Sequence, residues 1–287
     1  MIQRFDHAVI GIPDLDEGMA AFRQLGLEVT AGGRHPSLGT RNAIVRFGLD
    51  YLELLSVEYP DKARERGPFG ADLLHFLDNS SGLVGYVLAG AALQDQADGF
   101  QTLGIGADGP FEMDRIRPDG RRLEWRLVVP GGSPWRRSWP YLIDWVTPES
   151  DLLSWDPPGE HACAATGVAG VDLVVDDLKA TRQIYQTALG LQAETPDAPS
   201  KDRNVNSLSY RLGSFRLRLL EPTAAGPVAD ELEELGMGPY RLLLATSDLI
   251  TTAAVLSANG ILYSQTPEGL DLDPSAAAGA RIRFVPR

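Results

Sequence analysis

Short apolar runs, each of the length of a buried strand, recur along the chain. They lie at residues 7–12, 85–90, 171–175 and 241–245. After each run, apolar residues follow at helical spacing, as Leu15, Met19 and Phe22 do after the first. A glycine then closes each helical segment, at Gly26, Gly104, Gly190 and Gly260. The pattern predicts a strand followed by a helix, four times.

The four units match one another in register. A shift of 78 residues superposes Leu15 on Leu93 and Phe22 on Phe100. Further strand-like runs follow the helical segments, at 42–47, 51–57, 121–129, 208–212, 215–220 and 281–285. The chain is therefore predicted to contain four βαβββ modules.

A segment rich in proline, glycine and acidic residues separates the second unit from the third. It covers residues 146–167 and has no apolar periodicity. We therefore expect a first domain over 1–150, a linker over 151–167 and a second domain over 168–287.

The composition is that of a soluble globular protein, because 44% of the 287 residues are hydrophobic and 23% are charged. The net charge is −13 and is spread over both halves. This distribution argues against nucleic acid and anionic membranes as partners. The single cysteine, Cys163, excludes an intramolecular disulfide. With a charged, strand-like start, the sequence predicts a cytoplasmic protein.

Four stretches point to a known family: residues 5–12 (FDHAVIGI), 32–48 (GGRHPSLGTRNAIVRFG), 50–58 (DYLELLSVE) and 122–132 (RLEWRLVVPGG). In these stretches the N-terminal half resembles the glyoxalase-like domain of the vicinal oxygen chelate superfamily. The resemblance implies an α+β fold in which the four βαβββ modules pair into two half-barrel domains. The superfamily contains isomerases, dioxygenases, transferases and metal-free binding proteins, so the fold alone does not fix the reaction.

Strand alternation predicts which side chains face the concave side of each half-barrel. Ile10 packs toward the helix, which leaves His7 on the concave face, and the same alternation places Glu53 there. In the strand 121–129 we assign the charged positions Arg122, Glu124 and Arg126 to the concave face.

The resemblance implies up to four metal ligands, one from the first and one from the last strand of each module. Carried over, these positions are His7, Glu53, Gly85 and Glu124, and the glycine has no ligating side chain. Three protein ligands and an open position are typical of a catalytic site, and this set suits Zn²⁺, Mn²⁺, Ni²⁺ or Mg²⁺. Arg126 could instead neutralise Glu124 without a metal, and this alternative stays open.

Residues 32–42 are predicted to form an irregular loop at the rim of the first cup, because they contain four Gly and Pro residues. The loop carries donors for anionic groups, namely Arg34, His35, Thr40 and Asn42. Together with Arg122 and Arg126, we expect these residues to bind substrate.

In the second half, the positions that match the metal ligands are Gly170 and Arg241, with Arg218 and Arg283 near the other two. Arginine thus replaces the acids. We expect the second domain to be a divergent copy without a comparable polar pocket.

Two functions fit these observations. The first is a metal-dependent lyase or isomerase acting on a small oxygenated anion, with Glu53 or Glu124 transferring the proton. The alternative is a metal-free protein that sequesters a small molecule between Trp125, Trp135 and Trp139. We expect a small-molecule ligand in either case, and a monomer or homodimer.

Overall fold

The structure is a computed structural model that describes residues 1–65, 68–91, 93–132, 135–194 and 204–287. The first half contains β1 (Ile2–Gly11), α1 (Leu15–Gln24), β2 (Thr30–His35), β3 (Thr40–Arg46), β4 (Tyr51–Val57), α2 (Pro60–Glu65), α3 (Pro68–Asn79), β5 (Gly82–Gly90), α4 (Leu93–Thr102), β6 (Ala107–Ile116), β7 (Arg122–Pro130), β8 (Tyr141–Trp145) and α5 (Glu149–Trp155). The second half contains β9 (Ala165–Val174), α6 (Leu178–Thr187), β10 (Val205–Leu212), β11 (Phe215–Pro222), α7 (Pro227–Leu235), β12 (Gly238–Thr246), α8 (Leu249–Ala258), β13 (Tyr263–Thr266), β14 (Gly269–Leu272), the 3₁₀-helix Pro274–Ala277 and β15 (Ile282–Pro286).

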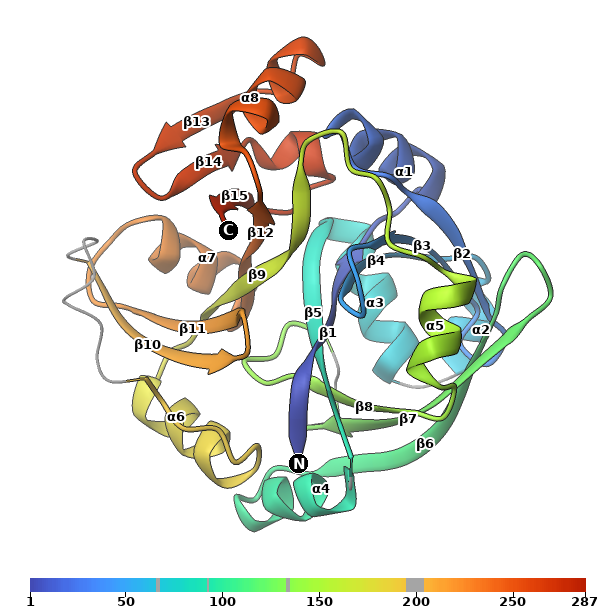
Figure 1. Cartoon of the computed structure of the whole chain (residues 1–287). Coiled ribbons are helices and arrows are strands. Elements are labelled where there is room, and N and C mark those ends of the chain that lie inside the picture. Colours follow the sequence, from blue (N-terminus) through green and yellow to red (C-terminus); the bar gives the residue numbers. More distant parts are fainter. Residues whose placement is uncertain (66–67, 92, 133–134, 195–203) are drawn as a thin grey trace.

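The first eight strands form a closed barrel in the order β1-β4-β3-β2-β6-β7-β8-β5 (Figure 1). Each module pairs its first and last strands in parallel, β1 with β4 and β5 with β8. The two modules join where β1 runs antiparallel to β5, and the barrel closes where Arg34 of β2 pairs with Ile116 of β6. The α+β fold of βαβββ modules is therefore confirmed, and the first cup is a closed barrel.

The last strand of the second module is β8, and not the run 121–129 that the sequence suggested. That run is β7, the third of the four strands in the module β5-α4-β6-β7-β8. The periodicity missed β6 because half of its residues are exposed and Gly109 and Pro110 interrupt it, so it has no apolar alternation. It missed β8 because the strand has only five residues and follows a segment rich in Trp and Pro.

The second half forms a seven-stranded sheet in the order β10-β11-β9-β12-β15-β14-β13. The fourth module, β12-α8-β13-β14-β15, is complete. In the described part of the third module, only β10 and β11 follow α6, together with an isolated bridge between Ala193 and Tyr210.

Several helices begin at a capping acid and end at a glycine. Asp14, Asp177 and Asp248 each cap a helix by accepting hydrogen bonds from backbone N–H groups of its first turn. The four closing glycines Gly26, Gly104, Gly190 and Gly260 all have φ between +68° and +82°. No helix among the described residues is long and apolar enough to cross a membrane.

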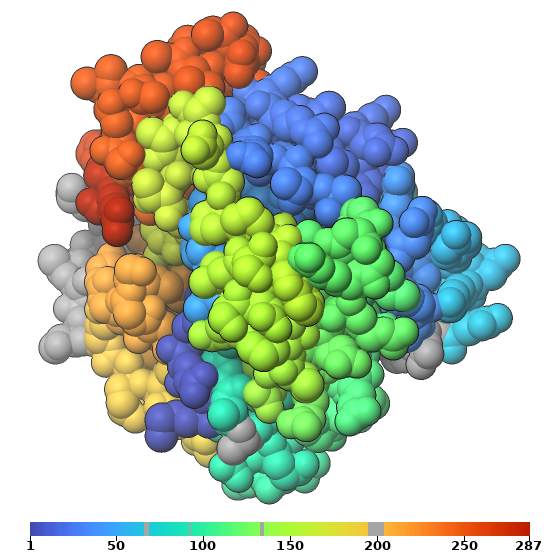
Figure 2. Space-filling model, turned by 45° about the vertical axis from the view of Figure 1, so that its right-hand side comes forward, coloured from blue at the N-terminus to red at the C-terminus, as the bar shows by residue number. Residues whose placement is uncertain are grey.

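The two halves share one continuous hydrophobic core. The Phe5 ring of β1 stacks on Phe215 of β11 at 4.3 Å between centroids. The hydroxyls of Tyr86 and Tyr185 hydrogen-bond to each other across the junction, and Tyr185 also donates to the Ser138 carbonyl at 2.6 Å. The chain between the sheets, yellow-green in Figure 2, lies against both the barrel and the orange C-terminal half. The barrel is thus supported from outside by the second half.

Candidate active site

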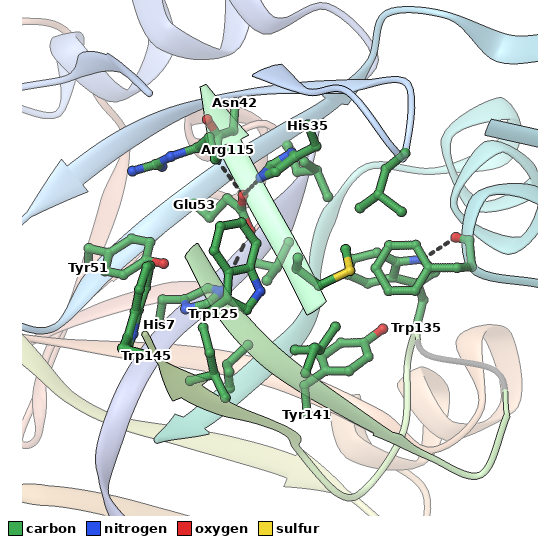
Figure 3. Close-up of a pocket in the computed structure, with 18 residues that line it drawn as sticks. His7, His35, Asn42, Tyr51, Glu53, Arg115, Trp125, Trp135, Tyr141 and Trp145 are labelled. Atoms are coloured by element: carbon green, nitrogen blue, oxygen red, sulfur yellow. Dashed lines mark hydrogen bonds and ion pairs between the residues drawn. The ribbon is translucent and has the colours of Figure 1, made fainter. Parts of the chain in front are cut away.

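A cavity of about 60 Å³ lies inside the barrel, with polar side chains gathered at one end and aromatic rings along its walls (Figure 3). The polar end is formed by His7, His35, Asn42, Glu53 and Arg115. The aromatic walls are Tyr51, Phe69, Trp125, Trp135, Tyr141 and Trp145. A ligand in this cavity therefore meets a charged group and apolar rings together.

Glu53 is the central acid of the polar end, and Figure 3 shows it between His35 and His7. Asn42 donates to its Oε1 at 2.5 Å, and the His35 Nε2 lies 3.8 Å from the same oxygen. The His7 Nε2 lies 3.5 Å from Oε2. Burial raises the pKa of Glu53, but its interactions with His7, His35 and Asn42 lower that pKa to about 2. Glu53 is therefore an ionised carboxylate in an otherwise aromatic cavity.

His7 is held in one orientation by Asp6. The His7 Nδ1 lies 2.6 Å from the Asp6 Oδ1, and because a carboxylate only accepts, Nδ1 carries the proton. Burial lowers the pKa of His7, but hydrogen bonds and charge from Asp6 and Glu53 outweigh it and raise that pKa. Asp6 is itself fully buried, and it accepts hydrogen bonds from Arg4 at 2.7 Å and from the Trp145 indole at 2.8 Å. Arg4, Asp6, His7 and Glu53 thus form a row of alternating charge.

His35 faces Glu53 from the other side and behaves differently. Its Nδ1 lies 3.0 Å from the Thr40 hydroxyl. Burial is the main cause that lowers the pKa of His35 to about 4, and the positive charge of Arg115 contributes. His35 is therefore a neutral imidazole at physiological pH.

The two imidazoles are expected to titrate far apart. His7 should stay protonated through pH 6.5 and lose its proton only above that value, because its pKa is raised. His35 should stay neutral until the pH falls to about 4. Nitrogen-15 NMR of the imidazole rings measures both transitions. Two rings that titrate together near pH 6.5 would contradict this electrostatic description.

Arg115 of β6 brings positive charge to the cavity. Its side chain is buried and makes no hydrogen bond to any residue that the structure describes. Its Nη2 lies 3.8 Å from the Asp156 Oδ2, and Arg46 and Arg117 each approach that same oxygen to 3.5 Å. Three guanidinium groups therefore share one buried carboxylate, which leaves excess positive charge beside the cavity.

Glu124, Arg122 and Arg126 do not face the cavity, so their predicted orientation is wrong. In β7 the apolar residues Leu123, Trp125 and Leu127 point into the barrel, and the charged residues alternate with them on the outside. Arg126 pairs there with Asp144 at 3.5 Å and Arg122 with Asp114 at 3.2 Å. The assignment failed because this cavity is mostly aromatic, so the apolar side of β7 is its inner side.

Residues 32–42 form the β2–β3 hairpin instead of an irregular loop, with only 36–39 outside the strands. The hairpin brings His35 and Asn42 into the cavity wall, with Thr40 behind His35. Arg34 points outward, is 64% exposed and pairs with Glu58 at 2.8 Å. Sequence reasoning also missed Asp6. It lies at a register shift in β1 between Phe5 and His7, where β1 has one residue more than the paired strand β5.

The residues present do not fit the divalent metal that the resemblance implies. Val9 pairs with Glu53 in the first module, and Val87 pairs with Tyr141 in the second, so Tyr141 is the counterpart of Glu53. The counterpart of His7 is Gly85, whose missing side chain would meet Tyr141 and Trp135. In the described parts of the chain, no three His, Cys, Asp or Glu side chains are placed to hold a metal ion. The expected shell of His7, Glu53 and Glu124 is therefore not formed.

The barrel and its paired modules define a protein of the vicinal oxygen chelate type. A family model described as "Glyoxalase-like domain" matches residues 5–189, and the chain belongs to this family.

Solved structures share the fold. A hypothetical protein from Staphylococcus aureus is 15% identical with a TM-score of 0.71, and 99% of each chain is covered. A triple mutant of 4-hydroxymandelate synthase from Streptomyces coelicolor is 14% identical with a TM-score of 0.61, covering 100% of this chain and 93% of that one. A search of curated proteins finds no significant match.

Proposed function

We propose that this protein is an isomerase or lyase that transfers a proton on a small oxygenated anion, with Glu53 as the proton acceptor and His7 as its partner. The observation that carries the proposal is the buried, ionised Glu53 facing an aromatic cavity, with each of its oxygens near a different imidazole. Two positioned titratable groups whose pKa values are shifted in opposite directions are typical of acid–base sites.

The chemistry begins at a carbon next to a carbonyl group of the substrate. Its proton passes to Glu53, and the electron pair moves onto the carbonyl oxygen, where the Nε2–H of His7 stabilises the negative charge. Return of the proton from Glu53 to a neighbouring carbon gives an isomer. Loss of a group from the next carbon gives a lyase reaction instead. The aromatic walls exclude water from the charged intermediate.

A carboxylate with a pKa of about 2 is a weak base, and the structure contains the means to strengthen it. Interaction with His7 is among the causes that lower the pKa of Glu53, whereas burial raises it. When the substrate oxygen replaces Glu53 as the acceptor of the His7 Nε2–H, that lowering influence weakens. The pKa of Glu53 then rises toward the operating pH, where a general base is most effective.

Arg115 supports an anionic substrate. It has no hydrogen bond within the described chain, and it lines the cavity at its polar end. A guanidinium group suits a carboxylate because it offers two parallel donors. In this proposal Arg115 takes the role that the sequence assigned to Arg34, Arg122 and Arg126.

The aromatic walls favour the second candidate, a metal-free protein that sequesters a small molecule. Trp125 and Trp135 line the cavity as that alternative expected. Trp139 does not, because it packs against Phe100 and donates from its indole to the Pro130 carbonyl at 3.0 Å.

Proton exchange with solvent tests both candidates. The protein is incubated in D₂O with a panel of small 2-oxo and 2-hydroxy acids, and NMR follows loss of the signal from the proton next to the carbonyl. We expect exchange with at least one compound. The rate should not change after treatment with EDTA, because only two of the four metal-ligand positions of the superfamily carry a ligating side chain here, His7 and Glu53. Binding without exchange would establish the sequestering function. Exchange that stops with EDTA and returns with a divalent ion would replace our proposal by the metal-dependent one.

A further inference from the structure

A concavity of about 680 Å³ lies between the second sheet and β1 of the first half, although the sequence led us to expect no comparable polar pocket in the second half. Its walls come from β1, β9, β10, β11, β12 and β15. Six arginines line it: Arg4, Arg211, Arg216, Arg218, Arg283 and Arg287. Only two acidic side chains, Asp50 and Glu268, are among its lining residues. This is the reverse of the chain as a whole, whose net charge is −13.

The strand register shows that arginines replace the ligand positions of the first cup. Asp172 of β9 pairs with Arg218 of β11 and with Arg241 of β12, as Val9 pairs with Glu53 and with Gly85. Arg283 of β15 pairs with Leu243, as Tyr141 pairs with Val87. In other members of this superfamily, four such positions bind a metal ion. Three of them carry a positively charged arginine here.

Acidic side chains hold these arginines in place. Asp172 is fully buried and accepts two hydrogen bonds from Arg218, at 2.9 and 2.8 Å, and one from Arg241 at 2.9 Å. Asp271 accepts two from Arg283, at 2.6 and 2.7 Å. Glu268 also accepts a hydrogen bond from Arg283, and together these bonds hold the guanidinium groups in place.

At the rim, Arg211 and Arg216 lie directly opposite each other on the antiparallel strands β10 and β11. Like charges in this relation repel each other. Glu194 is the acid they share, 2.7 Å from the Nε of Arg211 and 3.6 Å from the Nε of Arg216. Arg216 makes no hydrogen bond to any described residue, and its Nε is buried. An anion in the concavity would relieve this repulsion.

We infer that the cup of the second half binds a small polyanion, a molecule with two or more phosphate or carboxylate groups. The arginines lie on four different strands, β1, β10, β11 and β15, with Arg287 just after β15, so more than one anionic group can be held at once. The volume is within the range of about 300–1,000 Å³ typical of small-molecule sites. The site is separate from the barrel cavity and does not depend on the proposed acid–base chemistry.

Calorimetric titration with pyrophosphate and with citrate tests the inference, at constant low ionic strength. We expect saturable binding of at least one probe and about tenfold weaker binding by Arg216→Gln. Arg126→Gln is the matched control, because the two arginines have similar exposure and a similar distance to an acid. Arg126 is 50% exposed and lies 3.5 Å from Asp144. Arg216 is 40% exposed and lies 3.6 Å from Glu194. The control should bind as the wild type does.

The probes distinguish the kind of anion, since tighter binding of pyrophosphate indicates phosphate groups and tighter binding of citrate indicates carboxylates. The double variant Arg211→Gln/Arg216→Gln should weaken binding further, with folding checked by circular dichroism. Glu53→Gln should leave binding unchanged, which separates this site from the barrel cavity. The inference is overturned if neither probe saturates, or if Arg126→Gln weakens binding as much as Arg216→Gln does.

Discussion

Replacing Glu53 with glutamine is expected to lower the rate of substrate proton exchange at least about 100-fold. Glutamine keeps the shape of the side chain and can still accept a hydrogen bond from Asn42, but it cannot take a proton from carbon. It also removes one of the two carboxylates that raise the pKa of His7, so His7 should lose its proton at a lower pH. The exchange rate by NMR and the His7 titration measure the two effects.

Glu124→Gln is the control, because it makes the same chemical change on the outer side of β7. We expect its exchange rate to stay within about twofold of the wild type, since no catalytic contact is altered. The opposite result, with Glu124→Gln inactive and Glu53→Gln active, would return the site to the outer face of the barrel and disprove our assignment.

His7 and Glu53 were predictable because local rules determine which way they point. Each lies in a strand whose alternate residues, such as Ile10 and Leu54, are buried among the core that surrounds the barrel. That packing leaves one face of β1 and of β4 for the cavity. The same rule applied to Glu124 failed, because β7 is buried on its cavity side and solvated on its outer side. Alternation gives two faces, but it does not say which face is inside.

Arg115 and Asp6 could not be predicted from local patterns. Arg115 belongs to β6, whose residues show no apolar alternation and give no strand signal. It reaches the site because β6 closes the barrel against β2. Asp6 acts through the adjacent residue His7, and hydrogen bonds from Arg4 and Trp145 hold the Asp6 carboxylate in place. In the second half, the sequence correctly identified arginine in place of acids. The wrong step was to conclude that loss of ligands means loss of a pocket.

Asp172→Asn is expected to lower the free energy of unfolding by about 3 kcal/mol at neutral pH. Asp172 is fully buried between Arg218 and Arg241, whose side chains are 25% and 17% exposed. Asparagine leaves both guanidinium groups without their shared negative charge and cannot accept all of their hydrogen bonds. Urea unfolding followed by circular dichroism measures the change. The control Asp144→Asn breaks a more exposed pair with Arg126 and should cost less than about 1 kcal/mol.

The pH dependence of this loss gives a second check on the same ion pairs. Burial raises the pKa of Asp172, but the charges and hydrogen bonds of Arg218 and Arg241 outweigh it and lower that pKa below 3.8. Its contribution is therefore fully present above the unfolded-state value and is lost as the pH falls through the lower folded-state value. The difference in stability between the wild type and Asp172→Asn should accordingly be constant from neutral pH to about pH 5 and shrink in stronger acid. A difference that grows with acidity would mean that Asp172 is protonated in the native protein, and the arginines of the second cup would then lack the anchor on which their placement depends.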